Sequence, residues 1–248
     1  MSFIGASAGT RTATLVRNFA NCLSRAVVGR MNTYGKEGPS APRERLIRSG
    51  RGTWREFCEA INLDYDPDGV VALFDKHHVV DTLSFEEAVN TGVYMDHLEG
   101  VTTLLCSYGK SHRRETFDRD QPWSPMVNEC DGHIFTDMRE GHPMVDVYRE
   151  PWMSDTCVAI RGDKGQAAQL LGKPVLLFDD DVANIASVRR RSRPGCYMDG
   201  VLVQRGRRSH RGTPRGYVAD NDPFSWGRRM KKFALDPSDF PRRHYDAL

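Results

Sequence analysis

Short runs of apolar residues, bounded by turn-forming residues, recur through the middle of the chain. The longest of these runs cover residues 70–74, 101–106 and 175–178. Val, Leu and Phe predominate in them without strict alternation, which is typical of strands that are buried on both faces of a parallel sheet. Shorter runs predict three further strands at residues 133–136, 157–160 and 201–203.

Helical signals lie before and between these runs. The predicted helices cover residues 54–61, 84–100, 165–171 and 183–190. Ser84 and Glu87 have the spacing of a capping box, which marks the first turn of a helix. Gly172, followed by a lysine and a proline, is a stop signal for the third helix.

The alternation of strands and helices predicts an α/β fold: a doubly wound, Rossmann-like, mostly parallel sheet with helices on both faces. The three longest strands are expected to be adjacent and parallel. We expect this domain to cover residues 54–205, preceded by a basic arm and linker at 1–53 and followed by a basic, proline-containing tail at 206–248. A chain of 248 residues can bury a core of this kind without a metal or disulfides.

The first 53 residues differ in composition from the rest of the chain. No acidic residue precedes Glu37, and Leu15, Phe19 and Leu23 recur at helical spacing. A basic, serine-containing, amphipathic segment without acids is typical of an organelle transit peptide. A docked N-terminal helix and an unstructured basic arm are the alternative interpretations.

The composition excludes some classes of protein. No segment approaches the roughly 20 consecutive apolar residues that a membrane-spanning helix needs. The six cysteines include no CxxC pair and no zinc-finger spacing. We therefore expect a reducing intracellular compartment, the cytoplasm, or an organelle if the N-terminal segment is a transit peptide.

Polar residues that follow the apolar runs suggest where the chemistry lies. They are Asp75, Ser107, Lys164, Asp179 and Asp180. Because ligands bind beyond the carboxyl ends of parallel strands, these side chains are expected on one rim of the sheet. Carboxylates are the ligands that Mg²⁺ prefers, and Asp75 with Asp179 or Asp180 could hold this ion. A carboxylate can also attack phosphorus, while a hydroxyl and an ammonium group stabilise the transferred charge.

In their order along the chain, these positions resemble the four motifs of the haloacid dehalogenase (HAD) superfamily. The resemblance covers roughly residues 69–204 and rests on 74–82, 104–107, Lys164 and 178–184. It implies that Asp75 is the nucleophile and a metal ligand, and that Ser107 and Lys164 bind phosphate. It also implies that Asp179 and Asp180 are metal ligands, with Asn184 at the place of the family's usual trailing Asn. The implied activity is that of a Mg²⁺-dependent hydrolase or phosphatase acting on a phosphorylated substrate, either small or macromolecular.

Two departures from the family pattern change this expectation. The phosphatases of the family usually carry a second Asp two residues after the nucleophile, followed by Gly, whereas this chain has His77 and His78. Histidine can transfer protons near neutral pH, so His77 is the candidate for a substitute acid and base. Residues 83–100 leave room for one helix rather than a cap domain, so we expect an open site suited to a large anionic substrate or to a lid supplied by a partner.

Structural explanations also exist for each site residue. Asp75 could cap the turn after its strand, and Asp181 is expected to be the N-cap of the following helix. Ser107 could be a turn residue, and Lys110 is an alternative to Lys164. A structural role for His77 is as good an interpretation as a catalytic one.

Arginine is concentrated in two regions. Residues 1–51 carry nine Arg or Lys and two acids, and nine arginines between 182 and 215 accompany one acid, Asp199. The candidate polyanion-binding residues are Arg189, Arg190, Arg191, Arg193, Arg207 and Arg208. Such clusters bind nucleic acid without reading its sequence, although a solvated surface or a contact with anionic lipid or protein would look the same. The alternative function is therefore a catalytically inactive HAD-like protein that binds nucleic acid or another polyanion.

Overall fold

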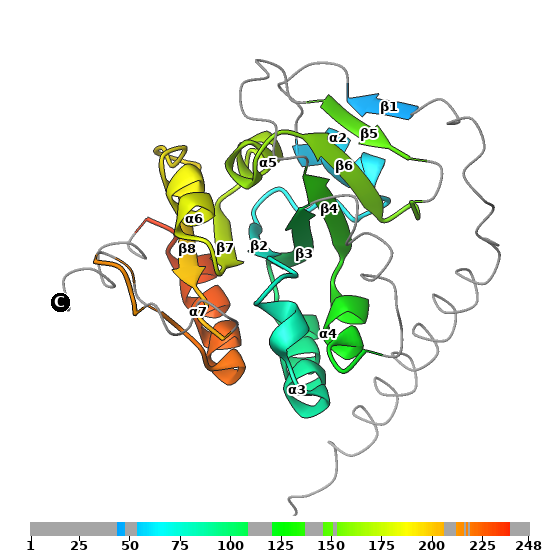
Figure 1. Cartoon of the computed structure of the whole chain (residues 1–248). Coiled ribbons are helices and arrows are strands. Elements are labelled where there is room, and N and C mark those ends of the chain that lie inside the picture. Colours follow the sequence, from blue (N-terminus) through cyan, green and yellow to red (C-terminus); the bar gives the residue numbers. More distant parts are fainter. Residues whose placement is uncertain are drawn as a thin grey trace, which may run out of the picture. The chain divides into compact units, whose positions relative to one another are not determined.

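A single sheet organises the computed structural model (Figure 1), which describes residues 44–47, 54–108, 121–136, 146–150, 153–205, 212–215, 217 and 219–238. Its strands are β1 (Glu44–Ile47), β2 (Val70–Phe74), β3 (Val101–Tyr108), β4 (Gly132–Thr136), β5 (Asp146–Arg149), β6 (Cys157–Arg161), β7 (Val175–Asp179) and β8 (Met198–Leu202). Within the described ranges, the strand order is β1-β5-β6-β4-β3-β2-β7-β8. The predictions for residues 1–43, Lys110, Arg207 and Arg208 lie outside the described residues.

Six neighbouring strands, from β6 to β8, are parallel. β5 and β1 extend the sheet in the antiparallel direction at the edge next to β6. β2 lies between β3 and β7 and is parallel to both, so the predicted adjacency of the three longest strands is confirmed. The α/β fold with a mostly parallel sheet is therefore the architecture of the described chain.

Helices cover both faces of the sheet. The helices are α2 (Trp54–Ala60), η1 (a 3₁₀ turn, Val80–Thr82), α3 (Phe85–Asp96), α4 (Ser124–Glu129), α5 (Lys164–Leu171), α6 (Val182–Arg189) and α7 (Pro223–Leu235). Side chains alternate between the faces of a strand. Val71 and Leu73 of β2 accordingly join a core with α2, α5 and α6, whereas Val70, Ala72 and Phe74 join a second core with α3, α4 and α7.

The chain reverses direction across the sheet between β2 and β7. From β2 it moves outward through α3 and α4 to β4, and both helices lie on one face. After β6 it crosses back, and α5 and α6 cover the opposite face on the way to β7 and β8. Connections between parallel strands are right-handed, so the connecting helices must change to the other face of the sheet when the chain changes direction across it. The gap between the ends of β2 and β7 is thus a topological switch point, where open α/β sheets bind ligands.

Helix α7 extends the domain beyond the predicted end at residue 205. Its residues Trp226, Met230 and Phe233 are at most 1% exposed, and the Trp226 ring centroid lies 5.9 Å from that of Phe74 and 5.6 Å from that of Phe178. Part of the predicted tail is therefore core. The predictions also missed α4 and β5, and placed β1 in a linker. Among the described residues, no helix is long and apolar enough to cross a membrane.

Candidate active site

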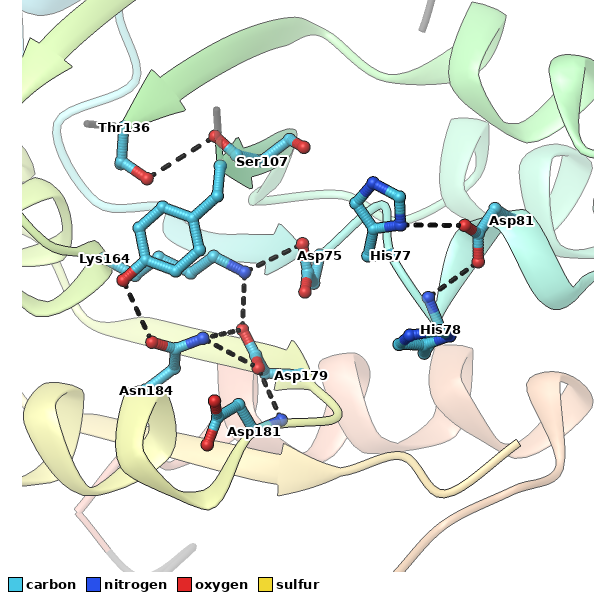
Figure 2. Close-up of polar contacts among 11 residues, drawn as sticks. Asp75, His77, His78, Asp81, Ser107, Thr136, Lys164, Asp179, Asp181 and Asn184 are labelled. Carbon is cyan, nitrogen blue, oxygen red and sulfur yellow. Dashed lines mark hydrogen bonds and ion pairs between the residues drawn. The ribbon is translucent and has the colours of Figure 1, made fainter. Parts of the chain in front are cut away.

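The predicted strand-end residues meet at the switch point (Figure 2). Asp75 follows β2, Asp179 ends β7, and Lys164 begins α5 after β6. The Nζ atom of Lys164 lies 2.8 Å from Asp75 Oδ1 and 2.6 Å from Asp179 Oδ2. Asp75 is 5% exposed, and the other two residues have no exposed surface. One buried ammonium group therefore joins the two carboxylates.

Local sequence around Lys164 fixes its place at the start of α5. Asp163 is the N-cap, and it forms a complete capping box with Gln166. The next residue, Gly165, packs against α6, and a Cβ atom there would clash with Ser187 Oγ and come within 2.8 Å of the Ser187 carbonyl carbon. Only a residue without a side chain allows α5 to approach α6 this closely, and this approach directs Lys164 toward the strand ends.

Asp179 accepts hydrogen bonds from three groups. Besides Lys164, the backbone N–H of Asp181 donates to Oδ1 at 2.7 Å. The Nδ2 atom of Asn184 lies 3.0 Å from Oδ1 and 3.2 Å from Oδ2. Asp181 is also the N-cap of α6, as predicted, because its side chain accepts from the Ala183 N–H. The loop between β7 and α6 therefore orients Asp179 rigidly.

Burial and the neighbouring charges shift the pKa values of this cluster. Burial raises the pKa of Asp75, and the ammonium group of Lys164 offsets part of this rise. Burial also raises the pKa of Asp179 to about 6, against the lowering effect of Lys164. Although burial acts to lower the pKa of Lys164, the carboxylates of Asp179 and Asp75 raise it above its ordinary value. The lysine therefore stays charged, and the carboxylates hold protons more readily than free ones.

A third carboxylate completes the cluster. Asp75, Asp179 and Asp180 are all buried, and each offers an oxygen within 4.8 Å of those of the others. Opposite ligands of Mg²⁺ lie about 4.2 Å apart, since each sits about 2.1 Å from the ion. Small side-chain movements would thus let these three oxygens contact one ion. The oxygen-only donor set suits Mg²⁺ rather than a soft transition metal.

Ser107 brings a hydroxyl group to the same rim. Its side chain has no exposed surface, and Oγ has no hydrogen-bond partner among the described residues. The backbone carbonyl of Ser107 accepts from Thr136 Oγ1 at 3.4 Å, so β4 fixes the backbone at this point. A buried hydroxyl without a partner costs free energy unless a ligand satisfies it.

His77 lies on the far side of Asp75 from Lys164 (Figure 2). Its Nδ1 atom is 3.3 Å from Asp81 Oδ2, and the hydrogen bond to Asp81 raises the pKa of His77, with burial opposing. Asp81 Oδ1 also accepts from the backbone N–H of His78, which has a φ of 58°. The sequence interpretation missed Asp81, although its spacing of four residues from His77 is a usable signal.

Tyr108 is the second residue that sequence reasoning missed. Its hydroxyl donates to Asn184 Oδ1 at 3.1 Å, and its ring centroid lies 5.1 Å from Lys164 Nζ. Tyr108 follows Ser107 at the end of β3, but neither the length nor the direction of its side chain is visible in a strand pattern.

The segment between Asp75 and β3 contains only η1 and α3, so no cap domain is inserted there. This matches the expectation of a single helix. The five predicted site residues nevertheless lie beneath the surface, since none of them is more than 8% exposed.

Two of the four described candidate polyanion-binding arginines form ion pairs within the protein. Arg189 forms an ion pair with Asp199 and lies 4.7 Å from the Tyr217 ring centroid. Arg191 donates to Ser187 Oγ at 2.6 Å and lies 3.6 Å from Asp163. Arg190 and Arg193 are exposed. Internal ion pairs thus account for part of the basic cluster.

No family model, curated protein or solved structure matches this chain.

Proposed function

We propose that the protein is a Mg²⁺-dependent phosphohydrolase of the HAD-like type, with Asp75 as the nucleophile. The observation that carries this proposal is the position of Lys164, within 2.8 Å of both Asp75 and Asp179 at the switch point of the sheet. A purely structural interpretation explains neither the third carboxylate nor the buried Ser107 hydroxyl at the end of the neighbouring strand β3. Phosphoryl transfer uses all of these groups.

The charge of the cluster favours a divalent cation. Asp75, Asp179 and Asp180 bring three carboxylates together, and the ammonium group of Lys164 contacts two of them. Buried charges without compensation are costly, so such a group takes up either protons or cations. The raised pKa values of Asp75 and Asp179 express the first response. Bound Mg²⁺ would provide the second, and it would neutralise charge on a phosphoryl group during transfer.

Asp75 has a free oxygen for attack. Lys164 binds Oδ1, whereas Oδ2 accepts no hydrogen bond from the described residues. In the first step, a carboxylate oxygen of Asp75 attacks phosphorus, and the bond from phosphorus to the leaving oxygen breaks. The Ser107 hydroxyl and the Lys164 ammonium group donate to the phosphoryl oxygens. In the second step, water attacks the aspartyl phosphate, which releases inorganic phosphate and restores the carboxylate.

His77 supplies the proton transfers in this scheme. The raised pKa of His77 keeps more of the imidazole protonated near neutral pH, as a general acid requires. The imidazolium gives its proton to the leaving oxygen in the first step and takes one from water in the second. Asp81 orients the ring through Nδ1, which leaves Nε2 as the transferring atom.

The test compares phosphate release by the wild-type protein and by Asp75→Asn, in the presence of Mg²⁺. Suitable substrates are a generic aryl phosphate and an end-phosphorylated oligonucleotide, because the size of the substrate is open. We expect Asp75→Asn to lose at least about a thousandfold in kcat. In wild-type protein quenched with acid, mass spectrometry should locate a phosphoryl group on Asp75.

Asp64→Asn is the matched control, because Asp64 is an exposed Asp in the turn before β2. It should retain full activity. Equal activity in wild type and Asp75→Asn would rule out the covalent mechanism. Salt-sensitive binding of nonspecific nucleic acid without phosphatase activity would instead favour the polyanion-binding alternative.

A further inference from the structure

Tyr108 connects two parts of the candidate site that lie on different elements. It is the last residue of β3, and its hydroxyl donates to Asn184 Oδ1 on α6 at 3.1 Å. The ring of Tyr108 lies beside the Lys164 side chain, 5.1 Å from Nζ to the ring centroid. Asn184 in turn donates to Asp179, which also accepts from Lys164 (Figure 2).

The amide of Asn184 has two ends of similar shape but opposite hydrogen-bonding character. With Oδ1 held by the phenol of Tyr108, Nδ2 faces Asp179 and lies within 3.2 Å of both carboxylate oxygens. The reversed amide would place a carbonyl oxygen against a carboxylate. Asp179, whose carboxylate only accepts hydrogen bonds, selects this orientation, and the phenol of Tyr108, which can donate or accept, fixes the position of the amide.

The ring of Tyr108 acts on Lys164 in a different way. The face of an aromatic ring attracts an ammonium group and also excludes water from it. Lys164 has no exposed surface, and its ammonium group lies between Asp75 and Asp179. The ring therefore restricts a long, flexible side chain to the position in which it reaches both carboxylates.

We propose that Tyr108 is a positioning residue of the site, which fixes Asp179 through Asn184 and Lys164 through its ring. This inference rests on the proposed function, since it assigns Tyr108 a role in forming the metal- and phosphate-binding geometry. Residues that hold metal ligands by hydrogen bonds typically change metal affinity by 10- to 100-fold when they are removed. The hydroxyl and the ring make separable contributions, so two variants distinguish them.

Tyr108→Phe removes the hydroxyl and keeps the ring, and Tyr108→Leu removes both. We expect Tyr108→Phe to weaken the binding of Mn²⁺, used as a probe for Mg²⁺ and measured by calorimetry, by about tenfold. Tyr108→Leu should weaken it further. Tyr65→Phe is the matched control, because Tyr65 is an exposed tyrosine whose ring also contacts a cation, Arg55. It should leave the affinity for Mn²⁺ unchanged.

A second readout does not depend on metal. The side-chain NH₂ resonances of Asn184, assigned by their loss in Asn184→Leu, should shift in metal-free Tyr108→Phe and exchange with solvent faster. A double-mutant cycle completes the test: in the Asn184→Leu background, Tyr108→Phe should have no further effect on the affinity for Mn²⁺.

Unchanged Asn184 resonances in Tyr108→Phe would overturn the proposal, as would additive effects in the cycle. A lower melting temperature with unchanged affinity for Mn²⁺ would also overturn it, since Tyr108 would then only stabilise the fold. If the wild-type protein binds no Mn²⁺, the proposed metal site is wrong. The Asn184 resonances alone then test the positioning role of Tyr108. Failure of the proposed function is seen separately, as equal phosphatase activity in wild type and Asp75→Asn.

Discussion

Lys164 is a charged side chain without exposed surface, and a buried ammonium group persists only with charged partners. Asp75 and Asp179 provide these partners, and each in turn depends on the lysine. Removing one member of such a group leaves the others buried without compensation, which costs about 3–5 kcal/mol. The loss of activity in any variant of this group must therefore be compared with its loss of stability.

His133 on β4 allows a prediction at the residue scale that is independent of the candidate site. Burial lowers the pKa of His133 from 6.5 to about 4, and its Nδ1 atom lies 3.4 Å from Cys157 Sγ. The unfolded chain binds a proton near pH 6.5 and the folded protein only near pH 4. This group therefore contributes about 3 kcal/mol to the free energy of unfolding. The contribution is fully present above pH 6.5 and is lost as the pH falls toward 4.

The measurement is urea unfolding at a series of pH values from about 7.5 to about 4, with wild type and His133→Asn in the same chelating buffer. We expect the free energy of unfolding to fall more steeply with decreasing pH in wild type than in His133→Asn. The difference between the two slopes should correspond to the uptake of up to one proton on unfolding. Parallel pH dependences in the two proteins would contradict the assigned pKa.

The sequence predicts those site residues whose location in the fold follows from their position along the chain alone. Asp75, Ser107 and Asp179 end apolar runs, and the ends of parallel strands meet at one rim. Asp81 and Tyr108 act through the direction of their side chains, which depends on a turn with positive φ at His78 and on contact with α6. No pattern of apolar and polar residues encodes such directions.

At the scale of elements, the contact between α5 and α6 determines where Lys164 points. Gly165→Ala would place a Cβ atom 2.8 Å from a backbone carbon of Ser187, which cannot move without moving α6. Overpacking of this kind typically costs about 1–3 kcal/mol. We expect Gly165→Ala to lower the free energy of unfolding by that amount and to reduce phosphatase activity beyond what the lost stability explains.

Gly92→Ala in α3 is the matched control for this prediction. Its nearest neighbour is the flexible side chain of Glu129, at 3.0 Å, and the nearest backbone atom is 3.5 Å away. Since alanine also favours the helix by about 1 kcal/mol, this variant should change stability by less than about 1 kcal/mol. Equal stability of both variants in chemical denaturation would show that α5 and α6 are not in rigid contact.

Helix α7 shows why part of the fold was not predicted. Its buried residues recur at helical spacing, but four Arg and Lys residues lie between them. The basic composition of residues 206–248 indicates a solvated tail, whereas the periodicity of Trp226, Met230 and Phe233 indicates a packed helix. Only their packing in one core with Phe74 and Phe178 shows that the segment is a packed helix rather than a solvated tail. This contact joins residues that are far apart in sequence.

For the whole molecule, the doubly wound connection brings together residues that are far apart in sequence. Asp75 and Asp179 are separated by about a hundred residues, yet they share one ammonium group because β2 and β7 are neighbours. The sheet therefore concentrates negative charge at its switch point, and the stability of the whole fold is coupled to the charge state of this cluster.

This coupling leads to a prediction about metal and pH. The pKa of Asp179 is raised from 3.8 to about 6, so the folded state binds this proton more tightly than the unfolded state. The stabilisation is fully present below pH 3.8 and is lost as the pH rises through about 6, which amounts to about 3 kcal/mol. Mg²⁺ binds the ionised carboxylates, so it should stabilise the protein more at about pH 7.5 than at about pH 5. At a concentration of 100 times its Kd, the gain at the higher pH should be about 2.7 kcal/mol.

Urea unfolding of wild type and Asp180→Asn, each with Mg²⁺ and with a chelator, checks this prediction at both pH values. Asp180 is the informative position, because it belongs to the carboxylate cluster but forms neither of the ion pairs with Lys164. We expect Mg²⁺ to stabilise wild type in a pH-dependent manner and Asp180→Asn only weakly. Equal stabilisation of both proteins would place the ion elsewhere, and stabilisation of wild type that is independent of pH would show that metal binding does not displace the proton of Asp179.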